Sequence, residues 1–148
     1  MTLASQTRLL IAAESPYCLQ LYDSDTGDLL SEIHGRELQG MPARVCMYGS
    51  GKAAASLFKQ SKIQLINTTD DKLTLDEMLD VNASVQGITS SDNHLVILYG
   101  SQPWLEVISE KGESIRIFDC WKNGDQFVKP SDLTVSEYGY IYVSDFGT

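Results

Sequence analysis

The side chains best suited to chemistry in this 148-residue chain are three cysteines and two histidines. The cysteines are Cys18, Cys46 and Cys120, an odd number without the spacing of a zinc site or a disulfide framework. They predict reduced, buried thiols of an intracellular protein. His34 and His94 each lie near the end of an expected strand, where a structural histidine is the usual interpretation. We therefore predict no catalytic residue, no metal site and no cofactor.

Two other patterns come close to ligand-binding motifs. Gly49-Ser50-Gly51-Lys52 looks like the end of a phosphate-binding loop, but Cys46 replaces the required earlier glycine and Ala53 follows the lysine. A hairpin turn explains these glycines. The acidic stretches 23–28 and 70–80 do not follow the calcium-loop pattern, and the sequence predicts solvated turns there.

The charge of the chain narrows the class of partner. Acidic residues outnumber basic ones by 20 to 11, for a formal net charge of -9. Nucleic-acid affinity depends on clustered Lys and Arg, so non-specific RNA or DNA binding is disfavoured. The first ten residues lack the pattern of a secretory signal, and no apolar window reaches the length of a membrane span. We expect a cytoplasmic protein with no membrane contact.

A repeated unit positions these residues. Within each unit, apolar segments begin at ten-residue steps: Leu9, Leu19 and Leu29; Ala53, Ile63 and Leu73; Leu95, Leu105 and Ile115. Successive units are offset by 44 and then 42 residues at the second segment. Four short strands per repeat of roughly 40 to 50 residues is typical of a propeller blade. The sequence therefore predicts an all-β fold, a β-propeller of four-stranded antiparallel blades.

The predicted propeller is incomplete. Its blade parts cover about residues 7–35, 43–80, 85–119 and 127–148, so that 1–148 forms about three to three and a half blades. A closed ring needs at least about four blades. We expect the remaining blades to come from a longer chain, for which this segment is a fragment, or from a homo-oligomer.

Three local details of this assignment are open to test. The first unit offers only three strands, at 8–13, 17–22 and 29–33, which makes thirteen strands in all. Residues 74–79 carry a capping-box pattern, but the repeat register favours a strand over a helix. Leu105 and Val107 alternate with Glu106, which predicts that the two apolar side chains face inward.

The segment 124–145 resembles the NHL repeat. It reads Gly-Asp-Gln-Phe-Val-Lys-Pro, then a short apolar strand, a turn glycine at Gly139, and the strand Ile141-Tyr142-Val143-Ser144-Asp145. The resemblance covers about one half-blade closely and residues 85–118 more weakly. The turn Asp23-Ser24-Asp25-Thr26-Gly27 is similar instead to a turn of WD40 blades. The letters Asn93-His94-Leu95 fall at a different place in the blade and carry no weight.

The resemblance implies a partial propeller of the tripartite-motif (TRIM-NHL) type. In that family RING, B-box and coiled-coil modules precede the propeller, which recruits a protein or RNA target, while the RING module supports ubiquitin transfer. This chain contains no zinc-ligand spacing and no coiled-coil heptads. Any ubiquitin-ligase activity would therefore belong to modules outside this sequence.

Propeller geometry also predicts a binding face. The connections between blades and the loops between second and third strands lie on one face, which collects the candidate binding residues Tyr17, Arg36, Gln102, Trp104, Trp121 and Lys122. Aromatic and Arg side chains are common interface anchors, although Trp also packs readily between blades.

We predict a non-catalytic protein-interaction module that recruits a protein target. One alternative is a propeller that binds single-stranded RNA, which the acidic charge disfavours. The other is a calcium-dependent lactonase-type propeller enzyme, for which the sequence offers no convergent set of acids and amides.

Overall fold

Four antiparallel β-sheets follow one another along the chain. The computed structural model describes residues 2–5, 7–100, 104–119 and 130–145, and within them it contains fourteen strands. Sheet 1 consists of β1 (Thr2–Ser5), β2 (Arg8–Glu14), β3 (Tyr17–Asp23) and β4 (Leu29–His34). Sheet 2 consists of β5 (Pro42–Tyr48), β6 (Lys52–Leu57), β7 (Lys62–Asn67) and β8 (Thr74–Asp80).

The second half of the chain begins with the same plan. Sheet 3 consists of β9 (Val85–Ser91), β10 (His94–Tyr99), β11 (Trp104–Ile108) and β12 (Ser114–Asp119). Sheet 4 has two described strands, β13 (Pro130–Val135) and β14 (Ile141–Asp145). Two short helices complete the elements, α1 (Gly35–Leu38) between sheets 1 and 2 and the 3-10 turn η1 (Thr69–Asp71) between β7 and β8. The prediction of an all-β fold built from four-stranded antiparallel sheets is confirmed.

The strand registers repeat from sheet to sheet. Leu19, Ile63 and Leu105 occupy the same place on the third strands and pair with Ile33, Leu79 and Phe118 on the fourth strands. The segment with the capping-box pattern is the strand β8, as the repeat register predicted. One prediction about strands is wrong, because sheet 1 has a fourth strand, β1, which pairs with β2.

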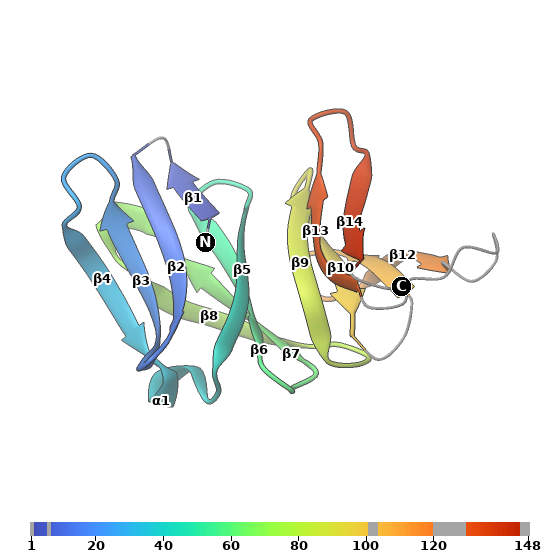
Figure 1. Ribbon diagram of the computed structural model, residues 1–148, viewed down its shortest axis with the longest axis horizontal. Coiled ribbons are helices and arrows are strands. Elements are labelled where there is room, and N and C mark those ends of the chain that lie inside the picture. Colours follow the sequence, from blue (N-terminus) through green and yellow to red (C-terminus); the bar gives the residue numbers. More distant parts are fainter. Residues whose placement is uncertain (1, 6, 101–103, 120–129, 146–148) are drawn as a thin grey trace.

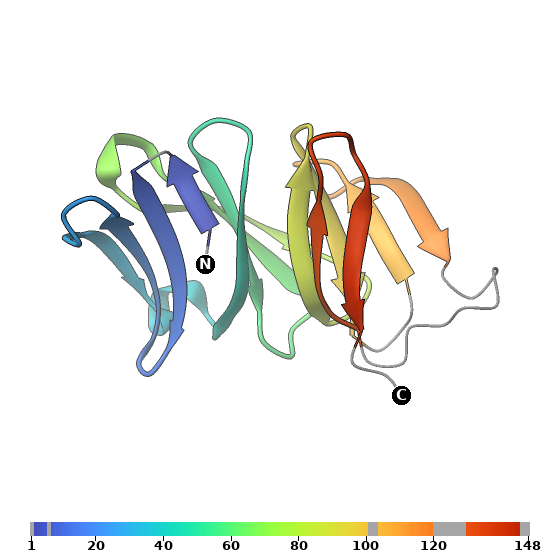
Figure 2. The same cartoon turned by 45° about the horizontal axis from the view of Figure 1, so that its top comes forward.

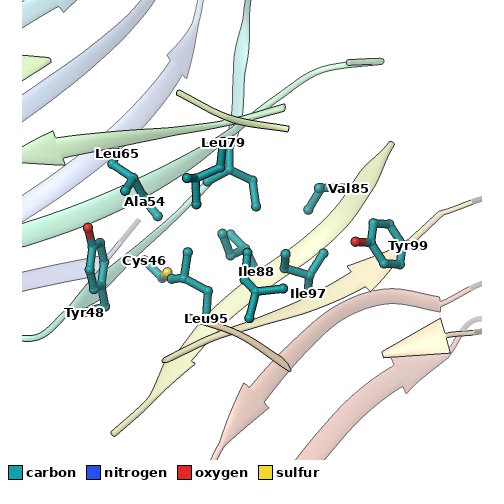
Figure 3. Packing of buried hydrophobic residues seen from close by; sticks show 12 residues of the cluster. Cys46, Tyr48, Ala54, Leu65, Leu79, Val85, Ile88, Leu95, Ile97 and Tyr99 are labelled. Carbon is teal, nitrogen blue, oxygen red and sulfur yellow. The ribbon is translucent and has the colours of Figure 1, made fainter. Parts of the chain in front are cut away.

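Each sheet packs mainly against the next one. Between sheets 1 and 2, buried Leu10, Leu19, Leu21 and Ile33 meet the small side chains of Ala53 and Ala55. Between sheets 2 and 3, a second apolar cluster joins Ile63, Leu65 and Leu79 to Leu95 and Ile97 (Figure 3). Successive sheets meet near their first strands, with β5 beside β2 and β9, and β13 beside β9 (Figure 1).

The four sheets form an open arc. Sheets 1 and 4 lie toward opposite ends of the molecule, and β4 and β12 point away from its middle (Figures 1 and 2). Hydrogen bonds and ion pairs reinforce the contacts between neighbouring sheets: Ser31 Oγ accepts the Leu73 amide at 2.9 Å, and Lys52 Nζ lies 3.3 Å from Glu110 Oε2. In the described ranges about three sheets are complete, and they form no closed barrel or ring.

Candidate functional site

Two of the predicted face residues, Tyr17 and Arg36, line one pocket. Tyr17 begins β3 directly after the turn that ends β2, and Arg36 lies on α1, which follows β4. The pocket has a volume of about 540 Å³, and its lining residues are Pro16, Tyr17, His34, Gly35, Arg36, Gly40 and Met41. We call it the Tyr17–Arg36 pocket. It lies where the β2–β3 turn meets the connection between sheets 1 and 2.

Gly35 allows the backbone to approach Tyr17 closely at this pocket. A Cβ on Gly35 would lie 3.0 Å from Tyr17 Cβ and 3.1 Å from the Tyr17 carbonyl oxygen, which is closer than ordinary van der Waals contact. A Cβ on Gly40 would clash with the side-chain amide of Gln60, which donates a hydrogen bond of 3.2 Å to the Gln39 carbonyl. Leu38 is completely buried and anchors α1 in the core. The pocket therefore rests on closely packed backbone.

Arg36 is the charged group of the pocket available to a ligand. Its side chain is exposed and, within the part of the chain that the structure describes, makes no hydrogen bond or ion pair. His34 differs, because its Nε2 lies 3.1 Å from Glu32 Oε1. The ring of Tyr17 is half exposed, at 51%. The pocket thus presents an aromatic ring beside an unpaired cation.

The Cys18 thiol lies near this region but is not activated. Burial raises the pKa of Cys18, and the neighbouring Glu32 carboxylate raises it further. Glu32 also accepts a hydrogen bond of 2.7 Å from Gln20 Nε2. Because a raised pKa lowers the fraction of reactive thiolate, Cys18 and Glu32 do not form a nucleophilic pair.

Trp104, another candidate of the predicted face, does not line this pocket. Trp104 begins β11, is half buried and packs against the apolar cluster between sheets 2 and 3. This is the packing position weighed above as the alternative for a tryptophan. Gln102, Trp121 and Lys122 lie outside the described residues. Of the described candidates, the structure brings Tyr17 and Arg36 together and packs Trp104 against the core.

Sequence reasoning missed a buried polar network around Glu106. Its side chain is only 3% exposed, although it was expected opposite the inward-facing side of its strand. Both faces of sheet 3 are covered, so the simple alternation of inside and outside fails there. Tyr99 Oη donates to Glu106 Oε1 at 2.6 Å and Ser114 Oγ donates to Oε2 at 2.8 Å. Asn82 Nδ2 lies 3.4 and 3.5 Å from the two oxygens.

The repeat itself carries the signal for this network. The residue after Leu19, Ile63 and Leu105 is Gln20, Gln64 and Glu106 respectively, a polar side chain at the same register of each third strand. Gln64 is also buried, at 4% exposed, and its amide donates to the carbonyls of Leu65, Asp76 and Glu77. A polar residue that recurs at one register indicates a shared structural role.

The acidic turn at 23–28 is organised by its own backbone. Asp23 Oδ1 accepts the amides of Asp25 at 2.8 Å and Thr26 at 3.2 Å, and these bonds hold the pKa of Asp23 below its ordinary value. Arg8 Nη1 lies 3.0 Å from the other oxygen. Among the described residues, no group of three or more His, Cys, Asp or Glu side chains is arranged to hold a metal ion.

Gly49 and Gly51 lie in the β5–β6 turn, and both have positive φ. Lys52 of the same pattern is paired with Glu110 of sheet 3. In the described ranges no helix is long and apolar enough to cross a membrane.

A second cavity of about 340 Å³ lies between sheets 3 and 4. Its lining includes Val96, Val107 and Ile115 from sheet 3 and Val135 and Ile141 from sheet 4, with Arg116 and His94 at its polar side. It is mainly a space between sheets, in contrast to the Tyr17–Arg36 pocket.

Solved structures match nearly the whole chain, whereas no family model and no curated protein matches it. Hydrazine synthase from Kuenenia stuttgartiensis has a TM-score of 0.75 at 14% identity, over 99% of this chain and 42% of that one. The β-propeller domain of Cps50 (Swd1) from Myceliophteria thermophila has a TM-score of 0.72 at 16% identity, over 94% and 47%. Sqt1 from Saccharomyces cerevisiae has a TM-score of 0.69 at 12% identity, and the match covers 95% of this chain and 41% of that one.

Likeness at these identities shows the fold. The chain is a β-propeller segment of about three blades, and it spans less than half the length of these three solved structures. The prediction of an incomplete propeller is confirmed. These structures include both an enzyme and a domain named only for its propeller fold, so they do not separate catalysis from binding. The NHL type stays a prediction.

Proposed function

We propose that this chain is a non-catalytic protein-interaction segment of a β-propeller and that the Tyr17–Arg36 pocket contacts its protein partner. The observation that carries the proposal is the convergence, at one pocket, of an exposed aromatic ring and an exposed Arg that has no ion pair among the described residues. Aromatic and Arg side chains dominate the binding energy of many interfaces. Aromatic rings bury a large area for few ordered torsions, and the planar Arg guanidinium forms paired hydrogen bonds with a carboxylate.

The chemistry of the pocket indicates which partner segment it takes. Pro16, Tyr17 and Met41 offer apolar contact, and Arg36 offers a guanidinium that pairs well with a carboxylate. The chain as a whole is acidic and would repel an acidic partner, so the attraction for an acidic partner segment comes from Arg36. We infer an extended peptide with an apolar side chain for the pocket and a carboxylate for Arg36.

The family context belongs to the same proposal. The half-blade at 124–145 resembles the NHL repeat, and β13 and β14 both fall inside that segment. This resemblance supports a cytoplasmic TRIM-NHL protein in which other modules carry ubiquitin-ligase activity and the propeller selects the target. The likeness to solved propellers supports the scaffold for this role.

The test is selection of peptides from a random displayed library on the chain, followed by titration of the selected peptides. Arg36→Glu and Tyr17→Ala are expected to weaken binding by about tenfold or more, which corresponds to about 1.4 kcal/mol. Arg44→Glu is the matched control, because Arg44 is also exposed but does not line the pocket. Equal affinity in all three variants would contradict the proposal.

Single-stranded RNA is the competing ligand, and the same variants decide between the two. Polyuridylate is titrated into the wild-type chain and the Arg36→Glu variant at two salt concentrations. The proposal predicts no saturable binding. Salt-dependent RNA binding that Arg36→Glu abolishes would assign the pocket to RNA instead.

A further inference from the structure

The Tyr17–Arg36 pocket continues onto sheet 2. Met41 lines the pocket, and its carbonyl oxygen accepts a hydrogen bond of 2.7 Å from the Phe58 amide, where the β6–β7 turn begins. Gln60 of the same turn donates its side-chain amide to the Gln39 carbonyl at 3.2 Å. The helix α1 and the β6–β7 turn lie on the same side of the molecule (Figures 1 and 2). A turn of sheet 2 is therefore fixed beside the pocket of sheet 1.

The β6–β7 turn presents a second aromatic ring and a second cation. The Phe58 side chain is 48% exposed, close to the 51% of Tyr17. Lys59 Nζ lies 5.2 Å from the centre of the Phe58 ring. Lys59 is exposed and has no ion pair among the described residues, whereas Lys62 of the adjoining strand lies 2.6 Å from Asp80 Oδ1. Each of the two sheets thus offers an exposed ring together with an exposed cation.

Lys59 has a backbone conformation that lysine rarely adopts. Its φ is 57°, in the left-handed region that a Cβ atom makes unfavourable. Six non-glycine residues of the described chain have positive φ, and four of them are Asp or Asn, which tolerate it best. The other two are Gln39 and Lys59, both at the junction of the pocket with the turn. Glycine would fit position 59 with less strain, so the Lys59 side chain indicates a role other than stability.

We infer that the partner peptide crosses from sheet 1 to sheet 2 and carries two carboxylates, one for Arg36 and one for Lys59; this inference rests on the proposed function. The peptide segment between the carboxylates packs apolar side chains on Met41 and Phe58. Two cations without ion pairs among the described residues favour an acidic occupant by charge complementarity. Packed sheets lie about 10 Å apart and an extended chain advances about 3.3 Å per residue, so about three residues separate the two carboxylates.

The probe is one peptide selected on the wild-type chain from a displayed library. The library has about twelve random residues, which span about 40 Å when extended and so reach across both sheets. The tightest-binding peptide is synthesised with a fluorescein label, and its affinity is measured by fluorescence anisotropy. Its sequence should contain two acidic residues separated by about three others. Replacement of either acid by the corresponding amide should weaken binding by about fivefold or more.

Three variants of the β6–β7 turn test the contact with sheet 2. Lys59→Glu should weaken binding of the probe by about tenfold or more, and Phe58→Ala by about fivefold. Lys59→Gly separates recognition from folding, because affinity should fall by about fivefold while the urea midpoint stays the same or rises. Lys72→Glu is the matched control, since Lys72 is also exposed but lies between β7 and β8, at the other end of sheet 2.

A double-mutant cycle assigns each carboxylate of the probe to one cation. The unmodified peptide should distinguish the wild-type chain from Lys59→Gly by about fivefold, whereas a peptide with one of its acids replaced by an amide should bind both about equally. The peptide with the other acid replaced should show the same pattern with Arg36→Gln. Coupling of both acids to Arg36 alone would contradict the inferred path across the two sheets.

The outcomes separate this inference from the proposed function. If Arg36→Glu weakens binding but the three turn variants bind as tightly as the wild type, the site is confined to sheet 1 and the inference is wrong. If the library yields no peptide, or Arg36→Glu has no effect, the proposed function fails as well. A fall of both affinity and urea midpoint in Lys59→Gly would assign Lys59 to folding. Salt-dependent displacement of the probe by polyuridylate would assign the surface to single-stranded RNA.

Discussion

Sheets 2 and 3 place a polar residue at the same register of their third strands, but they satisfy it in different ways. Gln64 donates to three backbone carbonyls of its own sheet, at the irregularity between β7 and β8. Glu106 accepts hydrogen bonds from the side chains of Tyr99 and Ser114, with the Asn82 amide nearby. The neutral amide of Gln64 donates to backbone carbonyls where the pairing of β7 with β8 is irregular. The carboxyl group of Glu106 accepts hydrogen bonds from side chains of several elements.

This difference implies different costs of removal. The partners of the buried Glu106 carboxyl group among the described residues are all neutral donors, so its burial depends on each of them. Loss of that carboxylate also leaves the hydroxyl of the buried Tyr99 without its acceptor. The carbonyls near Gln64 belong to a sheet that keeps its other hydrogen bonds.

The largest expected effect is therefore that of Glu106→Ala. It should lower the free energy of unfolding by about 3 kcal/mol, because it creates a cavity and leaves polar groups unsatisfied. Gln64→Ala should cost about 1 to 2 kcal/mol, since it removes one neutral donor group. Urea unfolding measures both, with Glu113→Ala as the exposed control. Equal losses of unfolding free energy in Glu106→Ala and Gln64→Ala would show that the two polar residues contribute alike to their sheets.

The next largest effect is a loss of stability at alkaline pH, caused by one tyrosine of sheet 2 and one of sheet 3. Burial raises the pKa of Tyr48 in β5 to about 12 from its ordinary value of 10.0. Burial also raises the pKa of Tyr99, and its hydrogen bond to Glu106 adds to the increase. Above about pH 10 the unfolded chain releases these protons while the folded chain keeps them. Stability should therefore be retained below about pH 10 and fall as the pH rises toward 12.

Phenylalanine variants sharpen this comparison. Tyr99→Phe should remove more of the alkaline loss than Tyr48→Phe, because the Tyr99 phenol is held by a carboxylate as well as by burial. Denaturant midpoints measured at pH 8 and at about pH 11 report the change. An alkaline slope that neither variant alters would show that these two phenols do not cause it.

The smallest expected effect comes from ion pairs at the surface. Lys52 and Glu110 join sheets 2 and 3 at 3.3 Å, and Lys62 and Asp80 join two strands of sheet 2 at 2.6 Å. Glu110→Gln and Asp80→Asn should each change stability by no more than about 0.5 kcal/mol, because the charges are exposed. The changes should vanish in 1 M salt, about where the Debye length falls to 3 Å. A larger, salt-independent loss for Glu110→Gln would assign a structural role to the pair between sheets.

The sequence predicted the fold through its repeat rather than through local preference. Residues 74–79 form a strand despite their capping-box pattern, because they pair with β7 on both sides of the irregularity at Asp76 and Glu77. β1 was missed, since Thr2–Ser5 is short and lacks the apolar spacing of the other strands. The helix α1 was missed as well. It has four residues, and its end is set by the left-handed backbone of Gln39.

The candidate site was predictable only in part. Propeller geometry placed Tyr17 and Arg36 on one face, and the structure brings them to one pocket. The position of Trp104 depended on packing between sheets, which no single strand reveals. Glu106 was misleading for the same reason, because a charged residue in an alternating strand is usually solvated and here a neighbouring sheet covers it.

The chain order of the strands has a consequence for how this protein unfolds. Every strand in a described sheet pairs with its sequence neighbours, and the main contacts between sheets join consecutive sheets only. Stability then behaves as a row of coupled units in which each unit is supported by those beside it. Opening should begin at the ends of the row, in sheets 1 and 4, and reach β6, β7 and β10 last. Sheets 2 and 3 would therefore stay folded longest, while sheets 1 and 4 unfold and refold against them.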